Sequence, residues 1–262
     1  MAPPQPARLS LLGGFALVFD DEPVALPAPA ERLLAQLAIN HRHRPARRAV
    51  LAERMWADAS PAQAASNLRS VLWRLPRPRG RQLVRSETTT LRLPADLEVD
   101  LWQGEAMAEL LCTAQDPLRP LTDEDLLLLL GQDLLPDWYD EWLSVERENF
   151  RQKRLHALER YAARLREQQR FVDALSAGLT AVRAEPLRES AHRTVIEVHL
   201  AEGNHAEALR QFHDYRRLLA DQLGLPPSPV IRELVAPLLG RPVERRRRPV
   251  SRRHAPGRTA ER

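Results

Sequence analysis

An arginine-rich stretch between residues 42 and 92 is the part of this sequence best suited to binding chemistry. That window holds 12 Arg and only three acidic residues, Glu53, Asp58 and Glu87, so its formal charge is +9. Guanidinium groups match phosphate and guanine edges bidentately, which favours a polyanionic partner such as nucleic acid. Codon bias explains why all but Lys153 of the 39 basic residues are Arg, but it does not remove acids from one window. A merely solvated basic face is the alternative.

The rest of the chain has a different charge balance. Residues 101–240 carry 16 basic against 23 acidic side chains, whereas residues 241–262 carry 9 Arg against 2 acids. This polarity predicts a basic module that faces a polyanion, joined to an acidic module with another task. The Arg-rich end has almost nothing apolar, so we expect it to be disordered and to add only undirected electrostatic affinity.

The helix predicted at residues 61–75 must present part of the basic window. Ser60 suits the N-cap and Pro61 the first helical position, while Pro76 and Pro78 end the helix. One apolar stripe at spacing i, i+3, i+4 and i+7 is expected to face the core. It consists of Leu68, Val71, Leu72 and Leu75.

The face opposite this stripe carries the residues predicted to contact DNA. A helix fits the major groove, and an Arg that donates two bonds to guanine gives about 1–3 kcal/mol of discrimination. Arg69, Trp73 and Arg74 are positioned for base edges, although Trp73 has partial burial as its alternative. Arg side chains near the start of the preceding helix, at residues 46–56, and on a wing are expected to meet phosphates. The full predicted set is Arg47, Arg48, Ser66, Asn67, Arg69, Ser70, Trp73, Arg74, Arg77, Arg85 and Arg92.

Short strands are predicted on both sides of the basic helix. Residues 8–26 indicate a small antiparallel meander, with a turn at 20–23 and a last strand at 24–26. Residues 83–85 and 91–93 read as a hairpin around a polar turn. Two strands after a basic helix make a wing.

Two further helices are expected before the basic helix, at residues 30–40 and 46–56. The second of them is expected to turn Val50, Leu51, Met55 and the stem of Arg54 inward. Together with the basic helix and the hairpin, they complete the element order of a winged helix-turn-helix.

The second half of the chain is predicted to be helical. Helices are expected at residues 100–111, 146–168 and 230–239, and a further helix is expected to begin after Thr122, which forms a capping pair with Asp125. A loop is expected at 116–120, and a connector with packed aromatic side chains at 134–142. The segment Asp173-Ala-Leu recurs as Glu207-Ala-Leu after 34 residues, which is the tetratricopeptide period. Gly178 stands where the second unit has Phe212, so we expect a shallower groove there.

Other reactive groups form no recognisable catalytic or metal-binding constellation. Cys112 is the one cysteine, which excludes an internal disulfide framework and a multi-cysteine metal site. His41 and His43 lie in a predicted loop without a third ligand, and Gly13–Gly14 lacks the pattern of a phosphate-binding loop. No G-x-S-x-G elbow occurs. We expect no enzyme activity, no cofactor and no metal.

Neither a membrane span nor a secretory signal is visible in the sequence. No run approaches 18 uncharged apolar residues, and the first residues lack a basic start with an apolar stretch and a cleavage site. A soluble, cytoplasmic protein is therefore expected.

Five distinctive segments stand in this order along the chain: Leu11-Leu-Gly-Gly-Phe15, Asn67-Leu-Arg-Ser-Val-Leu-Trp-Arg-Leu75, Leu134-Leu-Pro-Asp-Trp-Tyr-Asp-Glu-Trp142, Ala184-Glu-Pro-Leu-Arg-Glu-Ser-Ala-His192 and Leu223-Gly-Leu-Pro-Pro-Ser-Pro229. Together they resemble bacterial transcriptional activators of the SARP type. That resemblance implies a winged helix like that of OmpR-family regulators, followed by a bacterial transcriptional activator domain with tetratricopeptide-like repeats. It also implies promoter binding, often at direct repeats, and activation through RNA polymerase. Pro76 and Pro78 depart from the family by cutting short a further basic turn.

The sequence therefore predicts a mainly α protein with a small β component. A winged-helix DNA-binding domain is expected at 8–99 and a helical-repeat activator domain at 100–240, with disordered ends at 1–7 and 241–262. The expected partners are double-stranded promoter DNA, RNA polymerase and a second protomer on DNA, in the nucleoid. The alternatives are a helical-repeat protein-interaction scaffold whose N-terminal domain does not read DNA, and a nonspecific DNA-coating protein driven by the basic tail.

Overall fold

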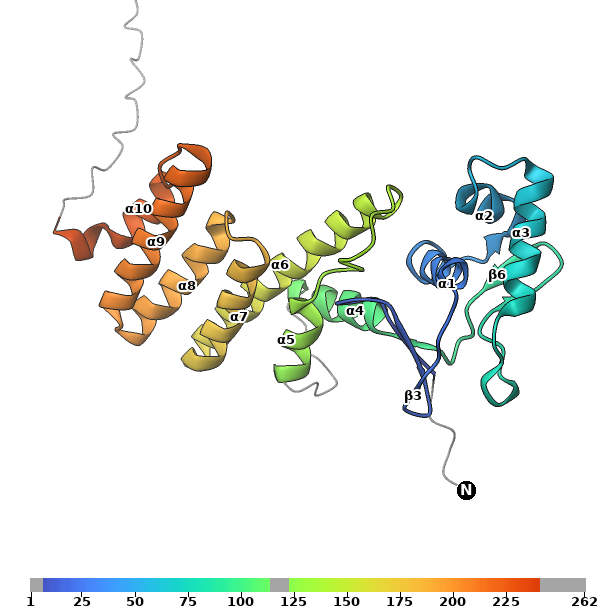
Figure 1. Cartoon of the computed structure of the whole chain (residues 1–262). Helices are drawn as coiled ribbons and strands as arrows, with labels where there is room; N and C mark the ends of the chain where they lie inside the picture. The colour runs from blue at the N-terminus through green and yellow to red at the C-terminus, as the bar shows by residue number, and fades with distance from the viewer. Residues whose placement is uncertain (1–6, 114–122, 241–262) are drawn as a thin grey trace, which may run out of the picture.

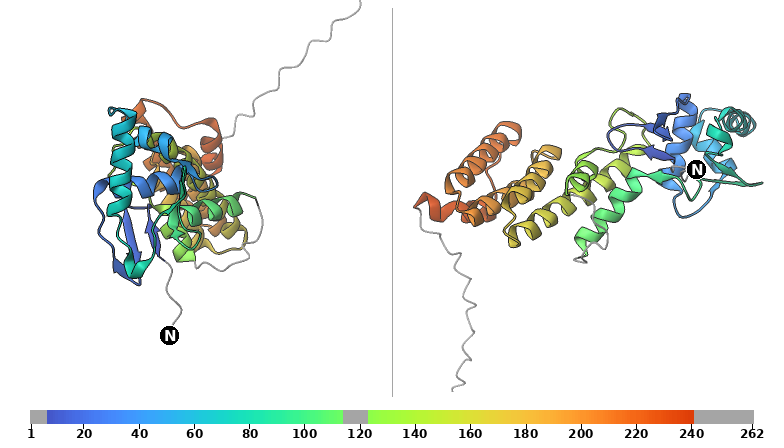
Figure 2. Two further views of the ribbon diagram at one scale, coloured as in Figure 1. Left: turned by 90° about the vertical axis from the view of Figure 1, so that its right-hand side faces the viewer. Right: turned by 90° about the horizontal axis from the view of Figure 1, so that it is seen from below.

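The computed structural model describes residues 7–113 and 123–240, which form an elongated, curved molecule (Figures 1 and 2). The strands and helices α1 to α3 lie at one end, and helices α6 to α10 follow one another toward the other end. Helix α3 therefore lies far from α10, and the two ends of the molecule are built differently. The predictions made for residues 114–122 and 241–262 lie outside the described residues.

Four short strands form the first sheet, in the order β3-β2-β1-β7. Strand β1 (Arg8–Ser10) pairs antiparallel with β2 (Ala16–Phe19) and parallel with β7 (Glu98–Val99), and β2 pairs antiparallel with β3 (Glu22–Pro23). The prediction of a longer turn at 20–23 and a last strand at 24–26 was wrong. Asp20 and Asp21 both have positive φ, 50° and 61°, so two residues reverse the chain and pairing resumes at once.

Ala7 is buried, and its carbonyl accepts a hydrogen bond from the amide of Glu98 at 2.9 Å. The prediction that residues up to 7 lie outside the fold was therefore wrong for Ala7. Pairing of the first strand with β7 extends one residue further than the alternating pattern indicated.

Three helices and a second, three-stranded sheet complete the winged-helix arrangement. The helices are α1 (Ala28–Asn40), α2 (Arg48–Met55) and α3 (Pro61–Arg74), and a 3-10 turn, η1, covers Pro78–Gly80. The sheet has the order β4-β6-β5, with β4 at Ala46–Arg47, β5 at Arg85–Ser86 and β6 at Thr90–Arg92.

Helix α2 begins two residues later than the sequence predicted. Ala46 and Arg47 pair with Leu91 and Thr90 of β6 instead of joining the helix. The inward face also differs from the prediction, because Val50 and Arg54 are exposed. The buried residues of α2 are Leu51, Ala52 and Met55.

The second half of the molecule is a series of antiparallel helices. Helices α7 and α9 begin 34 residues apart, as do the repeated sequence segments, so the predicted tetratricopeptide-like period is confirmed. The helix expected at 146–168 starts earlier, at Leu143, and the last helix changes to a 3-10 turn, η2, at Ala236 because Pro237 follows. The helices are α4 (Asp100–Cys112), α5 (Asp123–Gly131), α6 (Leu143–Glu167), α7 (Phe171–Ala184), α8 (Glu189–Glu202), α9 (His205–Leu223) and α10 (Pro229–Val235), with η2 at Ala236–Leu239.

Gly178 lets α7 approach α8 closely. A Cβ atom at this position would lie 2.9 Å from Cγ2 of Val195, which is closer than real Cβ contacts. The neighbouring helix thus occupies the space of the missing side chain, and the expected shallower groove stays a prediction.

The connector before α6 belongs to the core of the N-terminal unit. Leu134, Leu135, Leu143 and Phe150 pack in the same buried cluster as the strands and helices of residues 7–101. The aromatics of the connector behave differently from one another. Trp138 stacks on Phe15 with ring centroids 5.9 Å apart, and Trp142 is partly buried in the same core, whereas Tyr139 is 96% exposed, contrary to the expected packing.

Candidate nucleic-acid interface

Helix α3 lies along the outer edge of the N-terminal end, where one of its faces meets solvent (Figure 1). The hydroxyl of Ser60 accepts a hydrogen bond from the amide of Gln63 at 3.3 Å, so the predicted N-cap is confirmed. Ala64 and Leu68 are buried, and the remaining members of the apolar stripe, Val71, Leu72 and Leu75, are partly buried against the core.

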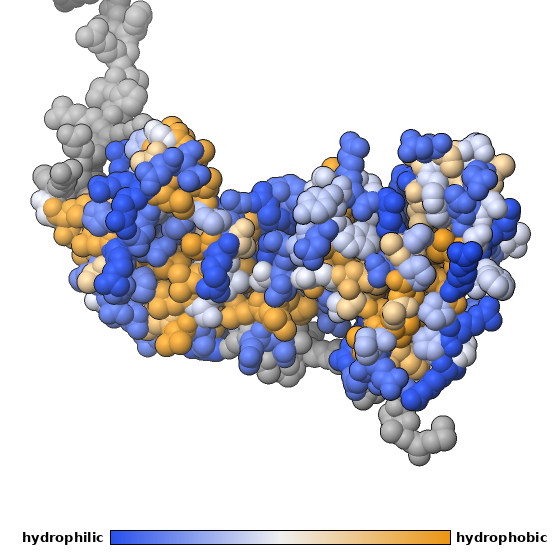
Figure 3. Space-filling view, in the orientation of Figure 1, coloured by the Kyte–Doolittle hydropathy of each residue, from blue (hydrophilic) through white to orange (hydrophobic). Residues whose placement is uncertain are grey.

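The outward face of α3 is cationic and open. Arg69, Ser70 and Arg74 are exposed, and Trp73 is 86% exposed, so the alternative of a partly buried Trp73 is excluded. Neither Arg69 nor Arg74 forms an ion pair with any described residue. The solvent-facing side of α3 between Arg69 and Arg74 is therefore available to a partner without loss of an ion pair among the described residues. Hydrophilic residues predominate along this edge of the molecule in the space-filling view (Figure 3).

The smaller polar residues of α3 are held by bonds within the helix. The side-chain amide of Gln63 donates to Oδ1 of Asn67 at 3.0 Å, and the hydroxyl of Ser70 donates to the carbonyl of Ser66 at 3.1 Å. Ser66 and Asn67 are half-buried. The amide NH₂ of Asn67 and the oxygen of Ser70 keep their capacity for a further bond.

A hollow of about 940 Å³ separates α3 from the start of α2 and the hairpin of β5 and β6. It brings together Arg47, Arg48 and Arg69 from the predicted set. Arg48 donates to the hydroxyl of Ser86 at 2.7 Å, and its backbone amide donates to the carbonyl of Thr89 at 2.9 Å, which fixes the start of α2 against the wing.

The hairpin tip adds residues to this hollow that the sequence reasoning missed. Glu87, Thr88, Thr89 and Thr90 line it, and the hydroxyl of Thr90 donates to Glu87 at 3.0 Å. Threonine hydroxyls next to arginines suit phosphate oxygens, whereas Glu87 opposes an anion. A polar turn flanked by arginines at 85 and 92 was the available signal.

The remaining predicted residues lie apart from this hollow. Arg85 and Arg92 lie on the wing, both exposed, and Arg92 is 3.8 Å from Glu87. Arg74 and Arg77 lie at and beyond the end of α3. The structure thus divides the set between a helix face, a hollow beside it and a wing strand.

Three other arginines of the basic window are engaged in contacts within the molecule. Arg79 pairs with Asp20, and Arg81 pairs with Asp96 and lies 5.8 Å from the ring centroid of Phe19. Arg42 is 3.5 Å from Glu105 and stands 5.3 Å from the ring centroid of Trp102. These side chains connect elements of the fold.

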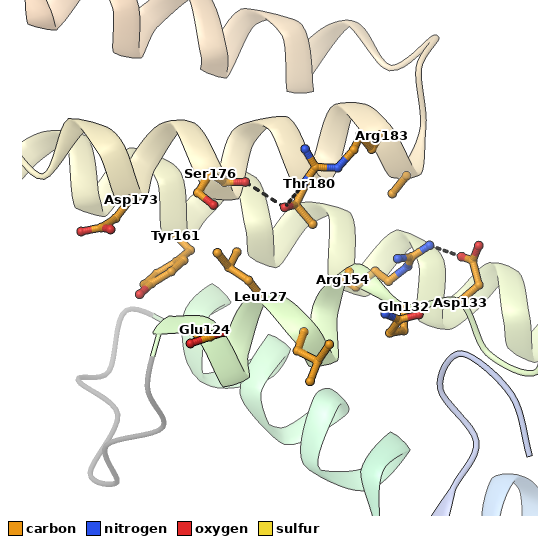
Figure 4. Close-up of a pocket in the computed structure, with 13 residues that line it drawn as sticks. Glu124, Leu127, Gln132, Asp133, Arg154, Tyr161, Asp173, Ser176, Thr180 and Arg183 are labelled. Atoms are coloured by element: carbon orange, nitrogen blue, oxygen red, sulfur yellow. Dashed lines mark hydrogen bonds and ion pairs between the residues drawn. The ribbon is translucent and has the colours of Figure 1, made fainter. Parts of the chain in front are cut away.

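A second hollow, between α5, α6 and α7, is built differently (Figure 4). Arg154 is buried there, donates to the carbonyl of Leu130 at 3.1 Å and pairs with Asp133, while its Nε atom has no partner. Burial lowers the pKa of Arg154, and Asp133 partly opposes that effect. On the adjacent helix α7, the guanidinium of Arg183 donates to the hydroxyl of Thr180 at 2.8 Å. Arg154 thus ties the end of α5 to α6.

A family model for the bacterial transcriptional activator domain matches residues 77–239. The chain belongs to that family. The predicted SARP-type resemblance is thereby confirmed. In the described part of the family member, no three His, Cys, Asp or Glu side chains gather as a metal site, and no helix is long and apolar enough to cross a membrane.

Two curated relatives of this family member are both named regulatory protein AfsR. That of Streptomyces coelicolor is 28% identical over 238 residues, and that of Streptomyces griseus is 26% identical over 236 residues. Each alignment covers 87% of this chain but 24% of the relative. The chain therefore spans about a quarter of the length of the relatives it matches.

A solved structure shares the fold of this activator-domain protein. It is Mycobacterium tuberculosis EmbR in complex with a low affinity phosphopeptide, with a TM-score of 0.64 and 21% sequence identity. The match covers 92% of this chain and 67% of that one. The mainly α fold with a winged helix-turn-helix and tetratricopeptide-like helices is confirmed.

Proposed function

We propose that this transcriptional regulator binds promoter DNA sequence-specifically through its winged helix and activates transcription through its acidic helical unit. The proposal divides the chain at residues 99 and 100, where β7 passes into α4. RNA polymerase, or a second protomer bound to the adjacent half-site, is the partner of the helical unit.

The observation that carries the proposal is the open cationic face of α3. Arg69 and Arg74 are exposed and have no carboxylate partner among the described residues, while Leu68 of the same helix is buried. A helix presented in this way enters the major groove with its guanidinium groups directed at base edges. No internal contact has to be broken first.

The surrounding arginines then set the register on the duplex. Arg47 and Arg48 stand at the beginning of α2, where the helix dipole also favours an anion. Arg85 and Arg92 on the wing reach phosphate or the adjacent minor groove. Phosphate contacts fix the orientation, and α3 supplies the sequence preference.

Selection of bound sequences from a random double-stranded DNA pool tests this function. We expect enrichment of one motif, repeated in tandem if two protomers bind side by side. The control is a variant in which Arg69 and Arg74 are both replaced by Ala, which should yield no enrichment while its circular dichroism spectrum stays unchanged. An unenriched pool with the wild-type protein would contradict sequence-specific binding.

A protein-interaction scaffold is the second candidate, and the helical repeats favour it. Stacked helix pairs present an extended surface suited to peptides. In that case the N-terminal unit would not read DNA, and the selection experiment would return the input pool.

A further inference from the structure

A cleft lies where the end of α1 and the residues that follow it meet α4 and α6 of the helical unit. Its volume is about 1170 Å³, close to the range of about 300–1,000 Å³ typical of small-molecule sites. It shares no residue with the hollow beside α3. Its lining residues include Ile39, Arg42, His43 and Arg44 from the first unit and Glu105, Ala106, Lys153 and Arg160 from the second.

Cations outnumber acids around this cleft. Four side chains carry a fixed positive charge, Arg42, Arg44, Lys153 and Arg160, against Glu105 and Glu109. This is the reverse of the balance in residues 101–240, where acids are in excess. Two of the four cations, Arg42 and Arg44, come from the basic window at residues 42–92, so the cleft is locally cationic where the two units meet.

Two of these cations have no carboxylate partner among the residues that the structure describes. Glu105 lies 3.1 Å from Lys153 and 3.5 Å from Arg42, so its charge is already shared between them. Arg44 forms no ion pair with any described residue, and within the described part of the chain Arg160 donates only to the carbonyl of Cys112 at 3.4 Å. Both side chains are exposed and belong to different units.

The cleft also has apolar walls. Ile39 at the end of α1 is half-buried, and Ala106 and Ala108 of α4 face it. Trp102, one turn before Ala106, donates its indole N–H to the carbonyl of Ala38 at 2.8 Å, which keeps α1 and α4 together. Apolar walls next to unpaired guanidinium groups suit a ligand with two chemically different ends.

We propose that this cleft binds a small organic anion, with its phosphate or carboxylate group at Arg44 and Arg160 and its apolar body against Ile39 and Ala106. A ligand of this class contacts both units at once. The site goes beyond DNA binding and holds whether or not α3 reads promoter sequence.

The isoleucines of the chain allow a direct test. There are three, and only Ile39 lines the cleft, whereas Ile196 and Ile231 are buried in the cluster of the C-terminal helices. A protein labelled with ¹³C at the isoleucine δ1 methyl groups thus gives one reporter and two internal references. The probe is 1-naphthyl phosphate, which joins an anionic group to an apolar ring.

We expect 1-naphthyl phosphate to shift the Ile39 methyl signal saturably and to leave the other two signals in place. Replacement of Arg44 and Arg160 by Glu should weaken binding at least tenfold. Replacement of Arg216 and Arg232 by Glu, an equal charge change at exposed positions of α9 and α10, should leave it unchanged. Inorganic phosphate and neutral 1-naphthol should each bind at least tenfold more weakly than the complete probe.

Three results would overturn the proposal. The first is an Ile39 signal that does not move, and the second is equal weakening by the two double variants. The third is displacement of the probe by a short DNA duplex at equal phosphate concentration, which would assign the cleft to the nucleic-acid backbone. None of these results depends on the selection experiment, so the two proposals fail separately.

Discussion

Arg74 and Arg154 carry the same side chain in opposite surroundings. Arg154 is 1% exposed, its pKa is lowered by burial, and its guanidinium is occupied by Leu130 and Asp133. Arg74 is exposed and has no partner among the described residues. Breaking the buried pair would leave an uncompensated charge, whereas Arg74 is free to exchange water for a ligand. Exposure without a partner is what distinguishes a binding arginine from a structural one.

Replacement of Arg74 by Ala should lower affinity for the selected DNA at least tenfold, because a bidentate contact to a base is worth about 1–3 kcal/mol. Fluorescence anisotropy with a labelled duplex at fixed salt measures the effect. The matched control is Arg216→Ala, an exposed arginine on α9, which should change affinity less than twofold. Equal affinities for the two variants would remove α3 from the interface.

His192 makes stability depend on pH. Burial lowers its pKa, while the Pro186 carbonyl and the carboxylates of Asp214 and Glu189 partly oppose that effect. Its ring stacks on Tyr215 with centroids 4.2 Å apart, and its two nitrogens meet the Pro186 carbonyl at 2.9 Å and the Gln211 amide at 2.8 Å. The folded state therefore favours the neutral ring.

The stabilising effect of neutral His192 should be complete above the unfolded-state pKa of about 6.5 and decline as pH falls below it. Urea unfolding at pH 7.5 and 5.5 should show a larger loss for the wild type than for His192→Gln. His41, whose pKa is also lowered by burial, contributes in the same direction to both proteins and cancels in the comparison. His205→Gln, at an exposed residue, should lose as much stability between pH 7.5 and 5.5 as the wild type. If the wild type loses no more stability than His192→Gln, His192 is not the source of the pH dependence.

At the scale of elements, local signals predicted α3 well. Ser60, Pro61 and Pro76 act within a few residues of the helix, and α3 runs from Pro61 to Arg74 as they indicate. Strand β4 was not predictable in this way, because Ala46 pairs with Leu91, which is 45 residues away. The outward position of Arg69 followed from helical periodicity, whereas the ion pairs that occupy Arg79 and Arg81 depend on tertiary contacts.

The close approach of α7 and α8 gives a test of element packing. Gly178→Ala normally stabilises a helix by up to about 1 kcal/mol, but here the new Cβ would lie 2.9 Å from Val195. We expect Gly178→Ala to destabilise the wild type. The same substitution should be neutral or stabilising in a Val195→Ala background. Thermal unfolding of the four proteins in this cycle measures the coupling, and additive effects would rule out the contact.

At the scale of the whole molecule, the two units share a hydrogen-bonded seam. The amide of Leu135 donates to the carbonyl of Leu11 at 2.8 Å, and the carboxylate of Asp100 accepts from the amides of Leu11 and Leu12. Arg147 of α6 donates to the carbonyls of Leu134, Leu135 and Trp138. These bonds hold the connector in one conformation beside the first sheet.

Loss of the Arg147 guanidinium should loosen this seam. Arg147→Met leaves buried carbonyls without their charged donor, so we expect a loss of about 1.5–3 kcal/mol in the free energy of unfolding. Hydrogen exchange should also become faster at the Leu135 amide. Arg210→Met removes an exposed pair with Glu207 and should cost less than about 1 kcal/mol. Equal losses in the free energy of unfolding for the two variants would mean that the Arg147 hydrogen bonds stabilise the fold no more than an exposed ion pair.

The charge distribution along the whole chain predicts how DNA binding responds to salt. Each neutralised phosphate releases counterions, so log K falls with log salt at a slope of about −0.9 for each contact. The winged helix and residues 241–262, which hold 9 Arg against 2 acids, should both contribute to the slope of the full chain.

A protein ending at residue 240 should show a shallower slope and weaker binding to every duplex. Its preference for the selected motif over a scrambled one should stay within twofold of the full chain, because the proposal assigns base recognition to α3. Loss of all binding in a shortened protein whose winged helix stays folded would instead identify a nonspecific DNA-coating protein. A slope near zero for the full chain would favour the peptide-binding scaffold.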